Sequence, residues 1–213
     1  MLAVRYDLPK VAAAVTKDDL LRRPPGMYRF RELTPLDPRE EPITLGEGGT
    51  PLLPLPRLAG HLGLRHLWAK DEGQNPTGSF KARGLGMALT KARTLGVKGV
   101  MIPSAGNAGG AAAVYGARGG IPVAVVVPRG TPEAAVAEAI MAGAHVFTVD
   151  GSIATAGKLI AGMSAQIGWF DLATLKEPYR LEARRQWGSS SASSSSGTPP
   201  TFSCIPRAVA PAS

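Results

Sequence analysis

The chain has 213 residues, of which 44% are hydrophobic and 19% are charged. This composition suits a globular protein with a substantial core and excludes disorder of the whole chain. The net charge is +8, but the basic residues are spread along the chain, aromatic residues make up only 6%, and no RNA-binding or helix-turn-helix signature is visible. We therefore expect no nucleic acid partner.

Membrane insertion, secretion and metal binding also lack support in the sequence. No stretch approaches the ~18 consecutive apolar residues of a membrane span, and the first ten residues lack the pattern of a signal peptide. The single cysteine, Cys204, excludes an internal disulfide framework, and His61, His66 and His145 have no ligand spacing. We expect a cytoplasmic protein with no membrane partner and no metal site.

Short β-branched runs alternate with longer helical patterns from residue 66 onward. In chain order, the expected elements are a strand at 66–70, a helix at 79–95, a strand at 99–103, a helix at 107–118, a strand at 122–128, a helix at 132–142, a strand at 144–149, a helix at 153–167 and a strand at 169–173. The run PVAVVVP is nearly continuous in apolar residues, as in a parallel strand that is covered on both faces. The sequence therefore predicts an α/β fold with an open, mostly parallel sheet.

The two ends of the chain differ from this middle part. Residues 1–45 are rich in proline and charge, and we expect them to wrap around the outside of a domain at 46–182. Residues 183–213 contain nine of the thirteen serines and no acidic residue, and they end in a run rich in proline and alanine. This composition predicts a disordered tail.

The segment KDEGQNPTGSFKARG places a lysine, Lys81, in the first turn of a predicted helix. Cations are disfavoured there because the N-terminal end of a helix dipole is positive, so the pKa of Lys81 should be lowered. A lysine with a lowered pKa is a candidate for Schiff-base formation. The alternative is a surface lysine that follows a capping serine.

A second segment, SAGNAGG at 104–110, follows a predicted strand and precedes a predicted helix. Ligands of open α/β sheets bind beyond the carboxyl ends of the strands, where such loops lie. Glycines allow the backbone to approach a ligand, Asn107 offers a hydrogen-bond donor, and a helix N-terminus suits a carboxylate or phosphate. The alternative is a tight turn that requires small residues. A third segment, LGEGGTPL at 45–52, indicates by itself only a glycine turn.

Taken in this order and spacing, EGGTPL, NPTGSFKARG and SAGNAGGAAAVYG resemble the fold-type II pyridoxal phosphate enzymes, in particular the threonine synthase family. The run EPYRLE at 177–182 is similar to the same family, and the resemblance covers residues 1–182. It implies an incomplete form of the open parallel α/β architecture of tryptophan synthase β, pyridoxal 5'-phosphate as cofactor, a small amino-acid substrate and a possible homodimer.

The resemblance also implies roles for individual residues. Lys81 would hold the cofactor covalently and then move protons, Asn107 would hydrogen-bond the 3-hydroxyl of the pyridine ring, and Phe80 would form a wall beside that ring. Ser104 and its loop would hold the substrate carboxylate. Lys70 and Thr77 are further candidates for contact with the substrate phosphate or for the geometry of the site. The family often has threonine after the loop asparagine, whereas this chain has Ala108.

The implied reaction converts O-phospho-L-homoserine and water to L-threonine and phosphate, with the cofactor as an electron sink. Serine/threonine dehydratases and cysteine synthases share the lysine segment and the asparagine loop, so they remain alternative reactions. A non-catalytic α/β ligand-binding protein that retains the motif is a third possibility.

The tail at 183–213 lacks the glycine-rich phosphate loop that the resemblance leads us to expect. Codons compatible with 182–188 encode Gly-Lys-Lys-Thr-Met-Gly in a shifted frame, which is the usual continuation of the family after LE. Codons compatible with 200–213 encode Asp-Val-Leu-Val-Tyr-Pro-Thr-Gly-Gly-Gly-Thr-Gly-Leu in that same frame. We therefore expect that a one-base slip near codon 182 put the tail out of frame; a natural serine-rich extension is the alternative.

Overall fold

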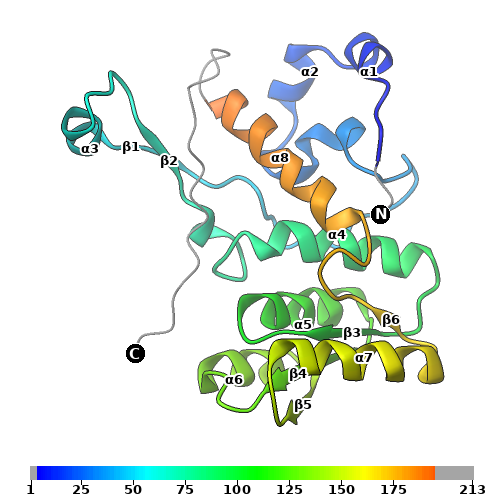
Figure 1. Ribbon diagram of the computed structural model, residues 1–213. Coiled ribbons are helices and arrows are strands. Elements are labelled where there is room, and N and C mark those ends of the chain that lie inside the picture. Colours follow the sequence, from blue (N-terminus) through cyan, green and yellow to red (C-terminus); the bar gives the residue numbers. More distant parts are fainter. Residues whose placement is uncertain (1–3, 195–213) are drawn as a thin grey trace.

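The computed structural model describes residues 4–194, which form a parallel sheet with helices on both faces and a separate two-stranded hairpin (Figure 1). The helices are α1 (Leu8–Ala14), α2 (Lys17–Arg22), α3 (Pro56–His61), α4 (Lys81–Thr94), α5 (Asn107–Gly119), α6 (Glu133–Met141), α7 (Ile153–Ile167) and α8 (Tyr179–Ser194), with short 3-10 helices η1 (Met27–Leu33) and η2 (Glu72–Gln74). The strands are β1 (Leu52–Pro54), β2 (Trp68–Lys70), β3 (Val100–Pro103), β4 (Val123–Pro128), β5 (His145–Val149) and β6 (Phe170–Asp171). None of the helices described is long and apolar enough to cross a membrane.

The main sheet has the strand order β5-β4-β3-β6, and all of its neighbouring strands are parallel. Successive side chains on a strand point to opposite faces, and the burial of β4 follows this alternation. Val123, Val125 and Val127 pack in the core on the side of α5, while Ala124 and Val126 pack against α7. The near-continuous apolar run in the sequence therefore reflects a strand that is covered on both faces, as predicted.

The strand expected at 66–70 forms as β2, but it does not join the parallel sheet. It pairs antiparallel with β1, with Leu52 opposite Lys70 and Pro54 opposite Trp68. This hairpin carries α3 at its outer end and projects away from the body of the molecule (Figure 1). Its inner end leads directly into the segment that precedes Lys81.

Helix α4 is buried along most of its length because it lies between α5 and α8 (Figure 1). Two glycines allow this close packing. A Cβ atom on Gly84 would lie 3.4 Å from Cβ of Arg180 on α8, and a Cβ atom on Gly86 would lie 2.9 Å from the ring of Tyr115 on α5. The start of α4 is therefore positioned by the helices on both of its sides.

Helix α8 continues through residue 182, where we expected a disordered tail to begin. Ala183 and Gln186 are buried, Ala183 packs with Met27 and Met87, and the side-chain amide of Gln186 donates a hydrogen bond to the Leu33 carbonyl at 2.6 Å. Residues 183–186 therefore take part in the packing of the described chain, whereas their composition predicts that they lie in a disordered tail. The remaining part of the expected tail, 195–213, lies outside the described residues.

Candidate functional site

Lys81 is the first residue of α4, and the turn before it determines where the helix begins. Gly78 ends that turn with φ +62, a left-handed conformation that favours glycine, and the amide of Lys81 donates to Ser79 Oγ at 3.3 Å. The side chain of Lys81 is partly buried, and it forms no ion pair with a carboxylate of the described residues. The predicted helix start at 79 thus lies two residues before the observed one, and the prediction that Lys81 lies in the first turn is confirmed.

Burial lowers the pKa of Lys81 below its ordinary value, and the nearby guanidinium groups of Arg184 and Arg180 lower it further. Both arginines lie on α8, which packs against α4. The direction agrees with the expectation from the sequence, and the structure adds two causes to it, burial of the amine and the cations of α8. A lysine in this environment is more often neutral and nucleophilic than an exposed lysine at the same pH.

Phe80 lies directly beside this amine. Nζ of Lys81 is 4.7 Å from the centroid of the Phe80 ring, and Cζ of Arg184 is 5.2 Å from the same centroid. Both distances are within the range of cation–π contacts. The structure therefore brings Phe80 and Lys81 together, as the assignment of an aromatic wall beside the lysine requires.

The loop at 104–110 connects the carboxyl end of β3 to α5, where ligands bind in open α/β sheets. Ser104 Oγ accepts hydrogen bonds from the amides of Gly109 at 2.8 Å and Gly106 at 3.3 Å, and it donates to the Gly106 carbonyl at 2.9 Å. Asn107 is the first residue of α5, and its side-chain amide has no hydrogen-bond partner among the described residues. Ser104 therefore shapes this loop in the structure.

The two further candidates, Lys70 and Thr77, differ in their surroundings. Nζ of Lys70 donates to the Thr50 carbonyl at 2.6 Å, so this side chain holds the loop before β1. Thr77 Oγ1 is buried and has no hydrogen-bond partner within the described part of the chain. A buried hydroxyl without a partner is costly, and a bound polar ligand would satisfy it.

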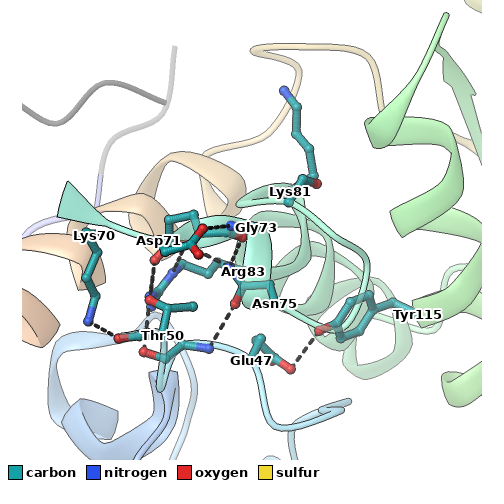
Figure 2. Close-up of polar contacts among 12 residues, drawn as sticks. Glu47, Thr50, Lys70, Asp71, Gly73, Asn75, Lys81, Arg83 and Tyr115 are labelled. Atoms are coloured by element: carbon teal, nitrogen blue, oxygen red, sulfur yellow. Dashed lines mark hydrogen bonds and ion pairs between the residues drawn. The ribbon is translucent and has the colours of Figure 1, made fainter. Parts of the chain in front are cut away.

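A second group of residues, which was not predicted from the sequence, lies beneath Lys81 (Figure 2). Arg83 is completely buried and forms a two-pronged ion pair with Glu72, with both N···O distances 2.7 Å. Glu47 and Tyr115 form a hydrogen bond in the same region. One signal was available in the sequence, because Arg83, like Lys81, is a cation in the first turn of a helix.

The candidate side chains fit part of the cofactor that the sequence motifs imply. The Lys81 amine with its lowered pKa suits an aldehyde, the adjacent Phe80 ring suits an aromatic plane, and the Asn107 side-chain amide and the buried Thr77 hydroxyl suit polar substituents. Asn107 follows the carboxyl end of β3 at the N-terminus of α5, while Lys81 lies at the N-terminus of α4, after the hairpin of β1 and β2.

The chain is similar to known proteins over most of its length. The family described as "Pyridoxal-phosphate dependent enzyme" matches residues 43–194. A threonine synthase of Methanosarcina acetivorans is 39% identical over 189 residues, covering 88% of this chain and 45% of that protein. A threonine synthase of Mycobacterium leprae is 40% identical over 164 residues, covering 76% of this chain and 45% of that protein. The chain thus spans about half the length of the curated relatives that it matches.

Among solved structures, a pyridoxal 5'-phosphate-dependent aspartate racemase is similar, with a TM-score of 0.64 and 25% identity. The match covers 69% of this chain and 46% of the racemase. The parallel sheet, the lysine at the start of α4 and the family match agree on one assignment. The chain belongs to the pyridoxal-phosphate dependent enzyme family.

Proposed function

We propose that this chain carries the lysine-and-asparagine half of a threonine synthase, which converts O-phospho-L-homoserine and water to L-threonine and phosphate. The main observation in support is the placement of Lys81, with its lowered pKa, beside Phe80. The threonine synthases that match at 39% and 40% identity support this choice of reaction. Pyridoxal phosphate is the cofactor of the family, and when bound it delocalises negative charge that develops next to the substrate nitrogen.

In this proposal each residue has a limited task. Lys81 holds the cofactor and then transfers protons through Nζ, which its lowered pKa favours. Asn107 donates a hydrogen bond to the pyridine 3-hydroxyl, and Phe80 excludes water from one side of the ring. Ser104 shapes the loop whose backbone amides receive the substrate carboxylate. The hydroxyl group of Thr77 forms a hydrogen bond with the substrate.

Lys70 has a more indirect task in this proposal. Its ammonium group is bound to the Thr50 carbonyl, so we assign it to the geometry of the site rather than to the substrate phosphate. A homodimer in the cytoplasm remains part of the proposal.

The cofactor assignment is tested by incubating the purified chain with pyridoxal phosphate and reducing it with borohydride. We expect a reduced adduct on the peptide that contains Lys81, found by mass spectrometry. The adduct should disappear in Lys81→Ala and persist in Lys98→Ala, whose lysine is exposed and lies after the same helix. An adduct that does not depend on Lys81 would support a non-catalytic α/β ligand-binding protein instead.

The reaction is tested by adding substrates to the chain with pyridoxal phosphate before the borohydride step. The amine of O-phospho-L-homoserine should replace Lys81 on the cofactor, and so lower the yield of the reduced Lys81 adduct, at lower concentration than L-serine or L-threonine, which dehydratases use. We expect weak cofactor binding and little turnover from the 213-residue chain, because the glycine-rich phosphate loop is not in its sequence. Rapid phosphate release by this chain would contradict that expectation, and ammonia release from serine would favour a dehydratase.

A further inference from the structure

The carboxylate of Glu72 joins three segments that precede or contain Lys81. Glu72 Oε1 accepts hydrogen bonds from Thr50 Oγ1 at 2.6 Å and from Arg83 Nη2 at 2.7 Å. Glu72 Oε2 accepts from Arg83 Nε at 2.7 Å and from Asn75 Nδ2 at 2.9 Å. A carboxylate has about four acceptor positions, and the loop before β1, the turn before Lys81 and α4 all donate to this one.

The partners of Glu72 are also connected to one another. Asn75 Oδ1 accepts from the amide of Gly48 at 3.1 Å, and Arg83 Nη2 donates to the Gly48 carbonyl at 3.1 Å. Arg83, Asn75 and Thr50 are 0%, 4% and 6% exposed. Hydrogen bonds to charged groups are stronger than those between neutral groups, and burial strengthens them further. This cluster is therefore a rigid support beneath the start of α4.

The support acts on Lys81 through helix geometry. Lys81 and Arg83 are two residues apart, so their side chains leave α4 in directions that differ by about 200°. Figure 2 shows the consequence: Arg83 points into the cluster, and Lys81 points away from it. Because Arg83 is held by two parallel hydrogen bonds, the first turn of α4 has little freedom to rotate.

Fold stability alone does not require this arrangement. Replacing a buried ion pair by apolar residues of similar volume is often neutral or stabilising, and a cation in the first turn opposes the helix dipole. An amine that must attack an aldehyde and then transfer protons, however, tolerates errors of only about 0.5 Å in its position. A need to fix the position of the Lys81 amine therefore explains the cluster better than a need to stabilise the fold.

We propose that Glu72 is a positioning residue: by holding Arg83, it orients the first turn of α4 so that Lys81 projects beside Phe80. This proposal rests on the proposed function, in which Lys81 holds the cofactor. Glu72 and Arg83 touch neither the cofactor nor the substrate in this arrangement. They act only through the direction of the Lys81 side chain.

The test uses the full chain and the double variant Glu72→Gln, Arg83→Met, which contains no unpaired buried charge. We expect its thermal midpoint to lie close to that of the unmodified chain, whereas Glu72→Gln alone lowers it because Arg83 is then left unpaired. We nevertheless expect the borohydride-trapped adduct at Lys81 to fall at least tenfold in the double variant. The matched control is Glu40→Gln, Lys91→Met, which removes an ion pair of 2.7 Å near the other end of α4 and should leave the adduct unchanged.

A second readout needs no cofactor. The rate at which a small acid anhydride acylates Lys81 is measured against pH in the ligand-free chain. The exposed Lys98 serves as internal reference. Burial and the α8 arginines hold the pKa of Lys81 below its ordinary value. If the Lys81 side chain moves away from these surroundings, its acylation rate should depend on pH more nearly as that of Lys98 does. Arg83→Lys, which keeps the charge but loses the two-pronged hydrogen bond, should produce the same shift and replaces the double variant if that variant fails to fold.

The outcomes separate this proposal from the proposed function. If the unmodified chain forms no adduct at Lys81, the cofactor assignment fails, and the acylation profiles alone decide whether Glu72 positions Lys81. An unchanged Lys81 profile in the double variant and in Arg83→Lys overturns the positioning role. An adduct yield that follows the thermal midpoint through all variants overturns it as well, because a merely structural role predicts that pattern.

Discussion

The hydroxyl group of Tyr115 donates a hydrogen bond of 2.7 Å to Glu47 Oε2, which joins the middle of α5 to the loop before β1. Both residues are almost completely buried. The same carboxylate oxygen accepts from Thr44 Oγ1 at 3.1 Å and from the Leu45 amide at 3.0 Å. Since Arg83 attaches this loop to α4, the loop connects the helix that begins with Lys81 to the helix that begins with Asn107.

Tyr115→Phe should therefore destabilise the chain by about 1–3 kcal/mol, the usual cost of leaving a buried acceptor with one partner fewer. Urea unfolding measures this change. The matched comparison is Tyr28→Phe, because Tyr28 Oη is buried and interacts with the neutral Thr90 hydroxyl rather than with a carboxylate. Its removal should be less costly, and equal losses in the two variants would show that the Glu47 contact contributes nothing specific.

Arg184→Gln should raise the pKa of Lys81, because it removes the nearby cation that contributes most, after burial, to lowering it. The pKa should stay below that of an exposed lysine, since the burial remains. At pH values between the two pKa values, less neutral amine is present, so Lys81 should be acylated more slowly than in the unmodified chain. Arg185→Gln is the control, because Arg185 is the next residue of α8 and is exposed; an equal effect there would point to net charge rather than proximity.

The same lowered pKa predicts how stability depends on pH. The unfolded chain binds a proton at Lys81 up to about pH 10.4, whereas the folded chain releases it at lower pH. Between these two values the unfolded state binds more protons, so the contribution of Lys81 to stability rises with pH. Lys81→Met should flatten the stability curve in this window, as urea midpoints measured at several pH values would show. An unchanged slope would contradict the lowered pKa.

Gly48→Ala should destabilise the chain more than Gly46→Ala. Both glycines have positive φ, +102 and +88, so each substitution incurs a backbone cost of about 1–2 kcal/mol. A Cβ atom at Gly48 would also lie 2.5 Å from the Met27 amide nitrogen and 2.8 Å from Arg83 Nη1, while one at Gly46 would have nothing within 4 Å. The difference between the two unfolding free energies isolates this crowding; no difference would mean that the loop can shift away from Arg83.

The DNA sequence across codons 178–215 tests the hypothesis of a shifted frame. We expect an added or missing base near codon 182, after which the corrected frame encodes Gly-Lys-Lys-Thr-Met-Gly and later a glycine-rich loop. An unaltered frame would favour the serine-rich extension. In that case Arg184 belongs to the natural protein, and its contact with Phe80 is part of the site.

Much of the fold could be predicted from the sequence because it depends on local periodicity. The alternation of apolar runs with helical patterns placed β3 to β6 and α4 to α7 to within a few residues. The pairing of β2 with β1 was missed, because a three-residue strand at 52–54 has too little pattern to stand out. Helix α8 was not predicted, because the last element expected from the sequence is the strand at 169–173 and much of α8 is rich in serine.

The site was predictable only in part, because local sequence patterns do not reveal contacts between segments that are far apart in the chain. Lys81 and Asn107 are each recognisable from the turn and helix around them. The cluster of Glu72 and Arg83 depends on contacts with Gly48 and Thr50, which lie 22 to 35 residues earlier in the chain. No periodic pattern encodes such contacts, so they became visible only when the fold brought the segments together. The unfavourable position of Arg83 in a helix was the one local clue to them.

The sharing of the Glu72 carboxylate also restricts how these segments could be exchanged between related enzymes. Thr50, Asn75 and Arg83 come from three separate stretches of sequence, and all of them donate to this one side chain. A chimera that takes the lysine-bearing stretch from one parent and the glycine-rich loop before β1 from another inherits a matched set of donors only if both parents use the same acceptor. Recombination should therefore succeed when its crossover points keep residues 48–83 together, and divergence at any of these four positions should require change at the others.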